Sequence, residues 1–216
     1  MDELVSLLLG GQQHGSDACF GFIPGGRDVA VDAVGFADFV NRALRLAQGL
    51  TEMGIGPGDR VALYASPNVR YMTTMAATLL VGGVVVPINQ HFRQREVSAY
   101  LTLVEPSAIL TDESTDGAVA AVKPDLQRIT TTAAVGERVV AIAQLESCDA
   151  AVPANVRGDD VAFIMHTSGT TGLPKGVVRT HRAYRAFVEM WAERYMARGD
   201  RVLRLFAIAL RRCGIL

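Results

Sequence analysis

Residues 60–88, RVALYASPNVRYMTTMAATLLVGGVVVPI, decide the fold because they contain a complete strand–helix–strand unit. The apolar runs at the two ends, RVALYA and VVVPI, each predict a short, mostly buried strand. Between them, Ser66 and Pro67 are typical of an N-cap followed by proline at the first helical position. We therefore expect a helix that runs to about Val81 and ends at the two glycines that follow.

The same alternation extends on both sides of this unit. Apolar residues at three-and-four spacing predict an amphipathic helix over 36–53. Downstream, the pattern predicts helices over 96–104 and near 118–122, and strands over 108–111, near 129, near 139 and over 160–165. This alternation favours an α/β fold with a layered, mostly parallel sheet and helices on both faces. The sequence contains no internal repeat and no obvious linker to a second domain.

The composition excludes several classes of function. Half of the 216 residues are hydrophobic, and a net charge of −1 with 6% aromatic residues does not fit a general nucleic-acid-binding protein. The longest apolar stretch, 75–88, is interrupted by glycine and proline and is shorter than the ~20 residues of a membrane span. Three separated cysteines without a C-x-x-C pair predict neither a disulfide framework nor a zinc site, and we expect a reducing, cytoplasmic setting.

One segment carries a chemical signal. Basic and acidic side chains number 10 and 17 in residues 1–156 but 11 and 5 in residues 157–216. The basic part contains HTSGTTGLPKG at 166–176, directly after an expected strand. Its glycines let backbone N–H groups turn toward an anion, its hydroxyls add donors, and Lys175 adds a positive charge. The segment predicts a polyphosphate site, and the alternative is an ordinary Gly/Thr turn.

The spacing excludes two common phosphate loops. A Walker A loop requires G-x-x-x-x-G-K-[ST], but Pro174 stands five residues after Gly169, and Lys175 is followed by Gly176. The dinucleotide pattern G-x-G-x-x-G occurs nowhere in the chain. Walker-type NTPases and nicotinamide dehydrogenases are therefore excluded.

The string TSGTTGLPKG at 167–176 closely resembles the glycine-rich signature of the adenylate-forming, or AMP-binding, superfamily, which includes acyl-CoA synthetases, luciferases and adenylation domains of peptide synthetases. The strings GDRVALYASPN, LLVGGVVVPIN and PSAILTD stand in the order found in the N-terminal part of acyl-CoA ligases, so the resemblance covers about 36–202. The PIN form at 87–89 is closer to acyl-CoA ligases than to peptide-synthetase domains. This resemblance implies a carboxylic acid, specifically a fatty acid, as substrate.

The resemblance implies a two-step reaction. A carboxylate attacks the α-phosphate of ATP to give acyl-AMP and pyrophosphate, and the thiol of CoA then displaces AMP. Donors arranged around the β- and γ-phosphates stabilise the charge of the departing pyrophosphate. By the same resemblance, the phosphates are held by Thr167, Ser168, Gly169, Thr170, Thr171, Gly172 and Lys175, and Thr167 also helps to hold Mg²⁺. No residue of the chain is assigned a catalytic role.

The resemblance also implies an incomplete enzyme, because family members are substantially longer. Residues 1–216 would form a partial N-terminal AMP-binding domain of the acyl-CoA synthetase-like fold, truncated before the C-terminal half and the small lid domain. The ending, RLFAIALRRCGIL, departs from the family pattern after Leu203. We therefore expect an acid–CoA ligase-type chain with little or no activity alone. The alternatives are a nucleotide-binding or interaction fragment that needs a separately encoded C-terminal half, and a non-functional truncated product.

Other candidate residues carry weaker signals. His166 at the end of an expected strand is more typical of packing or hydrogen bonding than of proton transfer. His181 follows Thr180, which fits an N-cap, and a structural role is expected. Ser168 lacks the G-x-S-x-G context of a serine nucleophile. An apolar stripe has helical spacing and predicts core packing rather than an acyl pocket; it consists of Phe187, Met190, Trp191 and Tyr195.

Overall fold

The computed structural model describes residues 4–10, 19–22, 32–134, 136–167 and 175–195. Its helices are α1 (Leu4–Gly10), α2 (Phe36–Glu52), α3 (Val69–Leu80), α4 (Gln94–Val104), α5 (Asp116–Val122), α6 (Ile142–Leu145) and α7 (His181–Tyr195). Its strands are β1 (Cys19–Phe22), β2 (Asp32–Gly35), β3 (Arg60–Tyr64), β4 (Val84–Pro87), β5 (Ala108–Thr111), β6 (Gln127–Thr130), β7 (Val139–Ala141), β8 (Val161–Thr167) and β9 (Lys175–Thr180).

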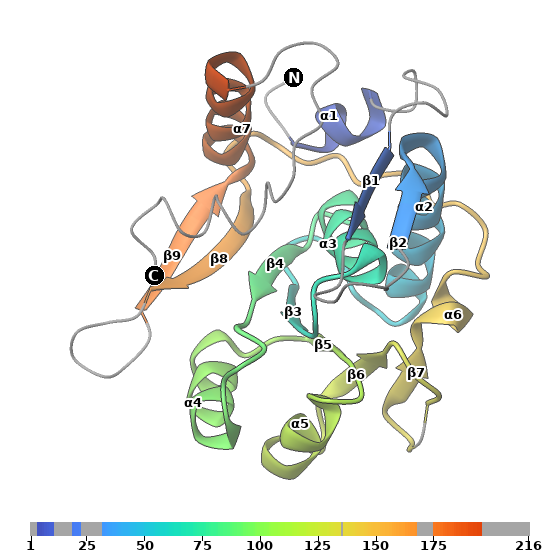
Figure 1. Cartoon of the computed structure of the whole chain (residues 1–216), viewed down its shortest axis with the longest axis vertical. Helices are drawn as coiled ribbons and strands as arrows, with labels where there is room; N and C mark the ends of the chain where they lie inside the picture. Colours follow the sequence, from blue (N-terminus) through green and yellow to red (C-terminus); the bar gives the residue numbers. More distant parts are fainter. Residues whose placement is uncertain (1–3, 11–18, 23–31, 135, 168–174, 196–216) are drawn as a thin grey trace, which may run out of the picture.

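A seven-stranded sheet forms the centre of the molecule, with the order β7-β6-β5-β3-β4-β8-β9 (Figure 1). The strands from β7 to β8 run parallel to their neighbours, and β9 pairs antiparallel with β8 at one edge. Strands β1 and β2 form a separate antiparallel pair. The predicted mostly parallel sheet is therefore confirmed, with one antiparallel strand at its edge.

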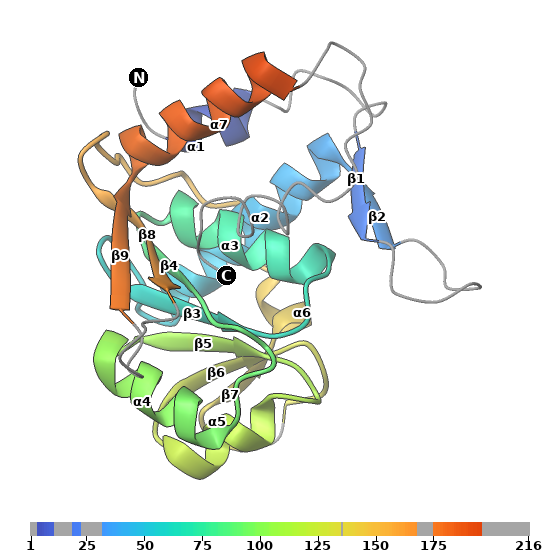
Figure 2. The same cartoon turned by 60° about the vertical axis from the view of Figure 1, so that its left-hand side comes forward.

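Helices cover both faces of the sheet, as predicted. Helices α2 and α3 lie on one face, and α4 and α5 lie on the other (Figure 2). The larger apolar core lies under α2 and α3 and includes the fully buried Leu46, Leu50 and Leu63. The smaller core lies under α4 and α5 and includes Tyr100 and Ile109. Each helix turns an apolar face inward because its apolar residues recur at three-and-four spacing.

The central β3–α3–β4 unit forms over the expected residues, but the start of its helix differs from the prediction. The N-cap of α3 is Asn68, whose side chain accepts a hydrogen bond from the Tyr71 N–H, and the helix begins at Val69. The prediction of Ser66 as N-cap was wrong because its side chain and its N–H are both hydrogen-bonded to Asp112, the N–H to Oδ2 at 2.7 Å. The predicted end of the helix is confirmed, because α3 stops before Gly82, which has a φ of +76°.

Candidate functional site

The phosphate-type segment connects strand β8 to strand β9, which together form a hairpin. The two strands pair antiparallel, with His166 opposite Gly176 and Thr167 opposite Lys175. The backbones of Thr167 and Lys175, the first and last of the predicted phosphate-holding residues, are therefore neighbours. The other five predicted residues lie outside the described residues; they are Ser168, Gly169, Thr170, Thr171 and Gly172.

The direction of β8 fixes the edge of the sheet at which this segment lies. β8 runs parallel to β4, with Phe163 opposite Val85, and β4 runs parallel to β3 and β3 to β5. The carboxyl ends of these strands therefore point to the same edge, and β8 ends there at Thr167. Loops that leave this edge form the ligand sites of open α/β sheets. The described end of β8 therefore lies at the edge from which ligand-binding loops leave in such sheets.

A polar network closes the same edge next to the ends of β3 and β5. The carboxylate of Asp112 accepts hydrogen bonds from the backbone N–H groups of Ser66 and Ser114, at 2.7 and 2.9 Å. The Thr115 hydroxyl donates to the carbonyl of Tyr64 at 2.6 Å. Burial raises the pKa of Asp112, but the hydrogen bonds from Ser114, Ser66 and Thr115 outweigh burial and lower that pKa below its ordinary value. These groups use their hydrogen-bonding capacity on one another, so we assign this network a structural role.

His166, the residue before the segment, is held by three neighbours. Its ring centroid lies 5.1 Å from that of Phe92 and 4.9 Å from that of Tyr100, the second in an edge-on arrangement. Its side chain also forms a hydrogen bond with the backbone of Pro87. Burial lowers the pKa of His166, and the bond to Pro87 partly offsets that effect. The predicted packing and hydrogen-bonding role is confirmed.

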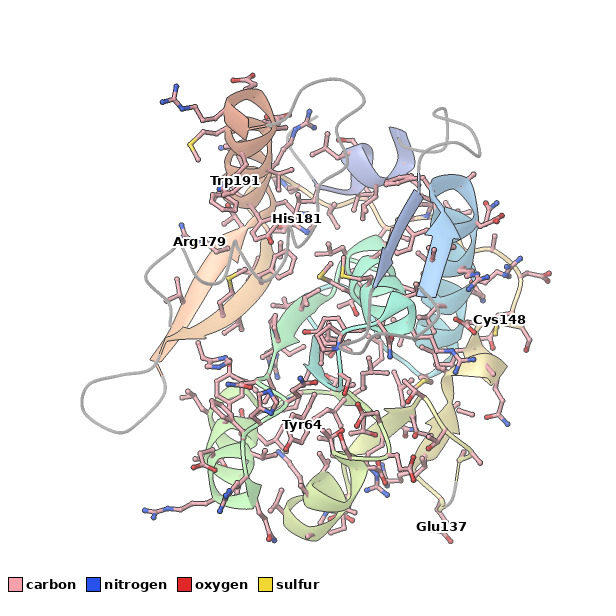
Figure 3. All side chains as sticks on the ribbon, viewed as in Figure 1. Tyr64, Glu137, Cys148, Arg179, His181 and Trp191 are labelled. Atoms are coloured by element: carbon pink, nitrogen blue, oxygen red, sulfur yellow. The ribbon has the colours of Figure 1, made fainter. Side chains whose placement is uncertain are left out.

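The start of α7 confirms two further predictions. The Thr180 hydroxyl accepts a hydrogen bond from the Ala183 N–H at 3.2 Å, as an N-cap residue does. His181 is fully buried between α7 and the body of the molecule, whereas Arg179 on β9 is exposed (Figure 3). His181 is therefore a core residue.

The described side chains of the predicted apolar stripe on α7 do not form a buried core, and the side chain of Tyr195 lies outside the described residues. Met190 is 54% exposed. Phe187 and Trp191 are half-buried, and Phe187 contacts Tyr184, whose ring stacks on Phe163 of β8 at 4.3 Å. The helix turns Tyr184 rather than Met190 toward the sheet, so the core prediction was wrong for Met190.

A cavity of about 590 Å³ lies near the amino ends of β3, β4 and β8, away from the carboxyl edge. Its lining combines apolar side chains with Arg60 and two acidic residues; it comprises Pro57, Gly58, Arg60, Gly82, Val84, Asp159, Asp160, Val161, Ile164 and Val178. The charged groups are engaged elsewhere. The Arg60 guanidinium donates to the Val104 and Glu105 carbonyls, and Asp159 forms an ion pair with Arg182 at 3.0 Å.

The acidic and thiol groups of the described residues do not form a metal centre, because no three His, Cys, Asp or Glu side chains are grouped to hold an ion there. Every helix of the described part of the chain is too short or too polar to cross a membrane.

Comparison with known proteins decides the family. Residues 24–209 match the family model described as AMP-binding enzyme. This chain belongs to the AMP-binding family. The resemblance seen in TSGTTGLPKG is thereby confirmed, and the match extends over most of the chain.

Relatives within the AMP-binding family include acid–CoA ligases. Long-chain-fatty-acid–CoA ligase FadD13 of Mycobacterium tuberculosis is 36% identical over 152 residues, which cover 69% of this chain and 30% of the ligase. Surfactin synthase subunit 1 of Bacillus subtilis is 30% identical over 168 residues, which cover 78% of this chain and 4% of that subunit. The chain thus spans less than a third of the length of either relative.

Solved structures of AMP-binding enzymes share the fold. The N-terminal domain of FACL13 from Mycobacterium tuberculosis superposes with a TM-score of 0.71 at 30% identity, covering 89% of this chain and 48% of that chain. A benzoate CoA ligase from Burkholderia xenovorans LB400 gives a TM-score of 0.72 at 20% identity, covering 90% of this chain and 37% of the ligase. The predicted acyl-CoA synthetase-like N-terminal fold is confirmed. None of these matches favours the alternative of an interaction fragment.

Proposed function

We propose that this chain supplies the phosphate-binding part of an AMP-forming acid–CoA ligase. The groups that hold the triphosphate of ATP are those of Thr167, Ser168, Gly169, Thr170, Thr171, Gly172 and Lys175. The acid is a fatty acid and the acceptor is CoA, which the similarity to long-chain-fatty-acid–CoA ligase FadD13 supports.

The observation that carries the proposal is the pairing of Thr167 with Lys175 across the β8–β9 hairpin. A segment rich in glycine and hydroxyl groups leaves the sheet at Thr167 and returns at Lys175, at the edge formed by the carboxyl ends of the parallel strands. This arrangement keeps the backbones of Thr167 and Lys175 next to each other before any ligand binds. Preorganised donors of this kind stabilise developing charge without reorganisation during the reaction.

The chemistry of the proposed first step needs this arrangement. When a carboxylate attacks the α-phosphate, the bond to the β-phosphate breaks and its electrons pass to the departing pyrophosphate. Backbone N–H groups, hydroxyls and the Lys175 ammonium group donate hydrogen bonds to the β- and γ-phosphates and thereby lower the energy of that transition state.

The segment offers oxygen donors to Mg²⁺, because Thr167 carries a hydroxyl and the phosphates supply the remaining ligands. This set fits a metal that keeps most of its own water and binds through substrate phosphates. When bound, Mg²⁺ neutralises charge on the phosphates, and the Thr167 hydroxyl is the chain's proposed ligand.

The test is the equilibrium binding of ATP to the purified chain by calorimetry in the presence of Mg²⁺. We expect ATP to bind at least about tenfold more tightly than AMP, because the proposed contacts are made to the β- and γ-phosphates. Inorganic tripolyphosphate, which carries the tail alone, is expected to compete with ATP. Equal affinity for ATP and AMP, or no competition by tripolyphosphate, would overturn the proposal.

A matched pair of variants assigns the binding to the segment. Lys175→Ala is expected to weaken ATP binding about tenfold, whereas Lys123→Ala is expected to leave it unchanged. Lys123 is the other lysine of the chain and lies at the carboxyl end of α5, a helix that packs beside α4. Equal effects of the two substitutions would indicate non-specific attraction between ATP and positive charge.

A further inference from the structure

The end of β8 that carries the phosphate-type segment extends past its neighbour β4. Phe163 of β8 lies opposite Val85 of β4, and two residues farther along β4 ends at Pro87. Proline has no N–H and cannot continue a ladder of backbone hydrogen bonds. β8 nevertheless runs on to Thr167, so its last residues are supported by the ladder with the edge strand β9.

The side chain of His166 connects this end of β8 to the rest of the molecule. Its ring forms a hydrogen bond with the backbone of Pro87, the residue at which the β4 ladder ends. It also packs against Phe92, in the connection between β4 and α4, and against Tyr100 of α4. One residue before the segment, the strand is therefore fixed to β4, to the connection and to α4.

The groups that hold the His166 ring are themselves fixed. Tyr100 is fully buried in the core under α4. Phe92 is held through its backbone: its carbonyl accepts the hydroxyl of Tyr64 at 2.6 Å, and its N–H donates to the carbonyl of Asn89 at 2.9 Å. A ring held between such partners restricts the strand end far more than an exposed side chain would.

We propose that His166 is a positioning residue, which fixes the end of β8 to which the phosphate-binding segment is attached. This inference rests on the proposed function of that segment. His166 acts through the backbone of Thr167, and its ring is engaged by Phe92, Tyr100 and Pro87. Precise placement of the segment matters because donors that are displaced by about 1 Å lose much of their effect on a bound phosphate.

The experiment measures the affinity of the full chain for ATP and for inorganic tripolyphosphate after substitution of His166. His166→Ala removes the ring and its hydrogen bond and is expected to raise the Kd for both ligands about tenfold. His166→Phe keeps the ring contacts and loses only the hydrogen bond, so we expect it to raise the Kd about threefold. If the ring contacts matter, the phenylalanine variant should bind ATP more tightly than the alanine variant and less tightly than the unmodified chain.

A control separates positioning from general loss of stability. Leu145→Ala removes a buried side chain of α6, far along the sheet from β8, and its Tm is expected to fall at least as much as that of His166→Ala. Its Kd for ATP should stay within twofold of the unmodified chain. If both His166 variants bind ATP within twofold of the unmodified chain, the inference is overturned while the proposed function stands. If the unmodified chain does not bind ATP, both are overturned.

Discussion

Thr167 and Lys175 are partner residues at the last position of the β8–β9 ladder. Directly opposite residues in antiparallel strands lie about 4.5–5.5 Å apart between their Cα atoms. The seven residues between them therefore leave and rejoin the sheet at nearly the same point. Thr167 and Lys175, which are separated by eight positions of sequence in TSGTTGLPKG, are thus adjacent in the backbone of the sheet.

The charge of Lys175 is predicted to determine how ATP affinity responds to salt. Lys175→Ala should flatten the dependence of Kd on NaCl between roughly 50 and 300 mM, because one of the screened charge pairs is lost. Lys175→Arg keeps the charge and should retain most of the wild-type slope, with about threefold weaker binding because the guanidinium has a different shape. Titration calorimetry at several salt concentrations measures this, and an unchanged slope in Lys175→Ala would contradict it.

The close contact between α2 and α6 predicts that Gly49→Ala destabilises the protein. A Cβ on Gly49 would lie 2.7 Å from Leu145 Cβ and 2.9 Å from Leu145 Cα, so the α6 backbone must move. Such overpacking costs about 1–3 kcal/mol, which exceeds the gain of up to ~1 kcal/mol from replacing glycine within a helix. Urea unfolding should therefore show a net loss.

Gly117→Ala is the matched control for this substitution. Gly117 also lies in a helix, but nothing lies within 4 Å of its added Cβ. Its free energy of unfolding should stay the same or rise by up to about 1 kcal/mol. A loss of equal size at both positions would show that the contact with Leu145 does not matter.

The sequence predicts the parallel part of the fold well because local patterns determine it. Helix α2 and the β3–α3–β4 unit are visible from apolar spacing and from glycine at their ends. The N-cap of α3 was predicted wrongly because a contact distant in sequence, from the Ser66 N–H to Asp112, decides it. Local sequence carries no information about such a contact.

The sequence predicted the candidate site only as a segment. The contacts that hold the ends of this segment were not predicted, because they too join residues that are distant in sequence. TSGTTGLPKG predicts a phosphate site, but it does not predict that Lys175 begins an antiparallel strand whose first residue pairs with Thr167. Nor does it predict that Phe92 and Tyr100 enclose His166. The aromatic residues after the strand VVVP are the one signal in the sequence that could have indicated this cluster.

Asp112→Asn is predicted to reduce stability in a manner that depends on pH. The hydrogen bonds that lower the pKa of Asp112 favour its charged form in the folded protein. Its contribution is therefore present above its ordinary pKa and is lost as the pH falls through the lower folded value. We expect a loss of about 1–2 kcal/mol at pH 7, because the partly exposed side chain accepts two backbone N–H groups.

The difference between Asp112→Asn and the unmodified protein should shrink as the pH falls below the ordinary aspartate pKa of about 4 and then through the lower pKa of the folded protein. Urea unfolding at a series of pH values measures this difference. Glu113→Gln, at the exposed neighbouring position, is the control and should change stability by less than about 0.5 kcal/mol. A loss that does not vary with pH would contradict the role of the Asp112 charge.

Two tyrosines, one that contacts the His166 ring and one that contacts Phe92, are predicted to differ in how the loss of the hydroxyl group changes stability. The Tyr64 hydroxyl donates to the Phe92 carbonyl at 2.6 Å, so Tyr64→Phe leaves that carbonyl without its donor and should cost about 1 kcal/mol. The Tyr100 hydroxyl is buried and has no hydrogen-bond partner among the described residues, and burial raises its pKa. Tyr100→Phe removes an unsatisfied polar group, so stability should stay the same or rise by up to about 1 kcal/mol. Urea unfolding of the two variants measures this difference. A larger loss of unfolding free energy at Tyr100 than at Tyr64 would show that the Tyr100 hydroxyl has a hydrogen-bond partner in solution.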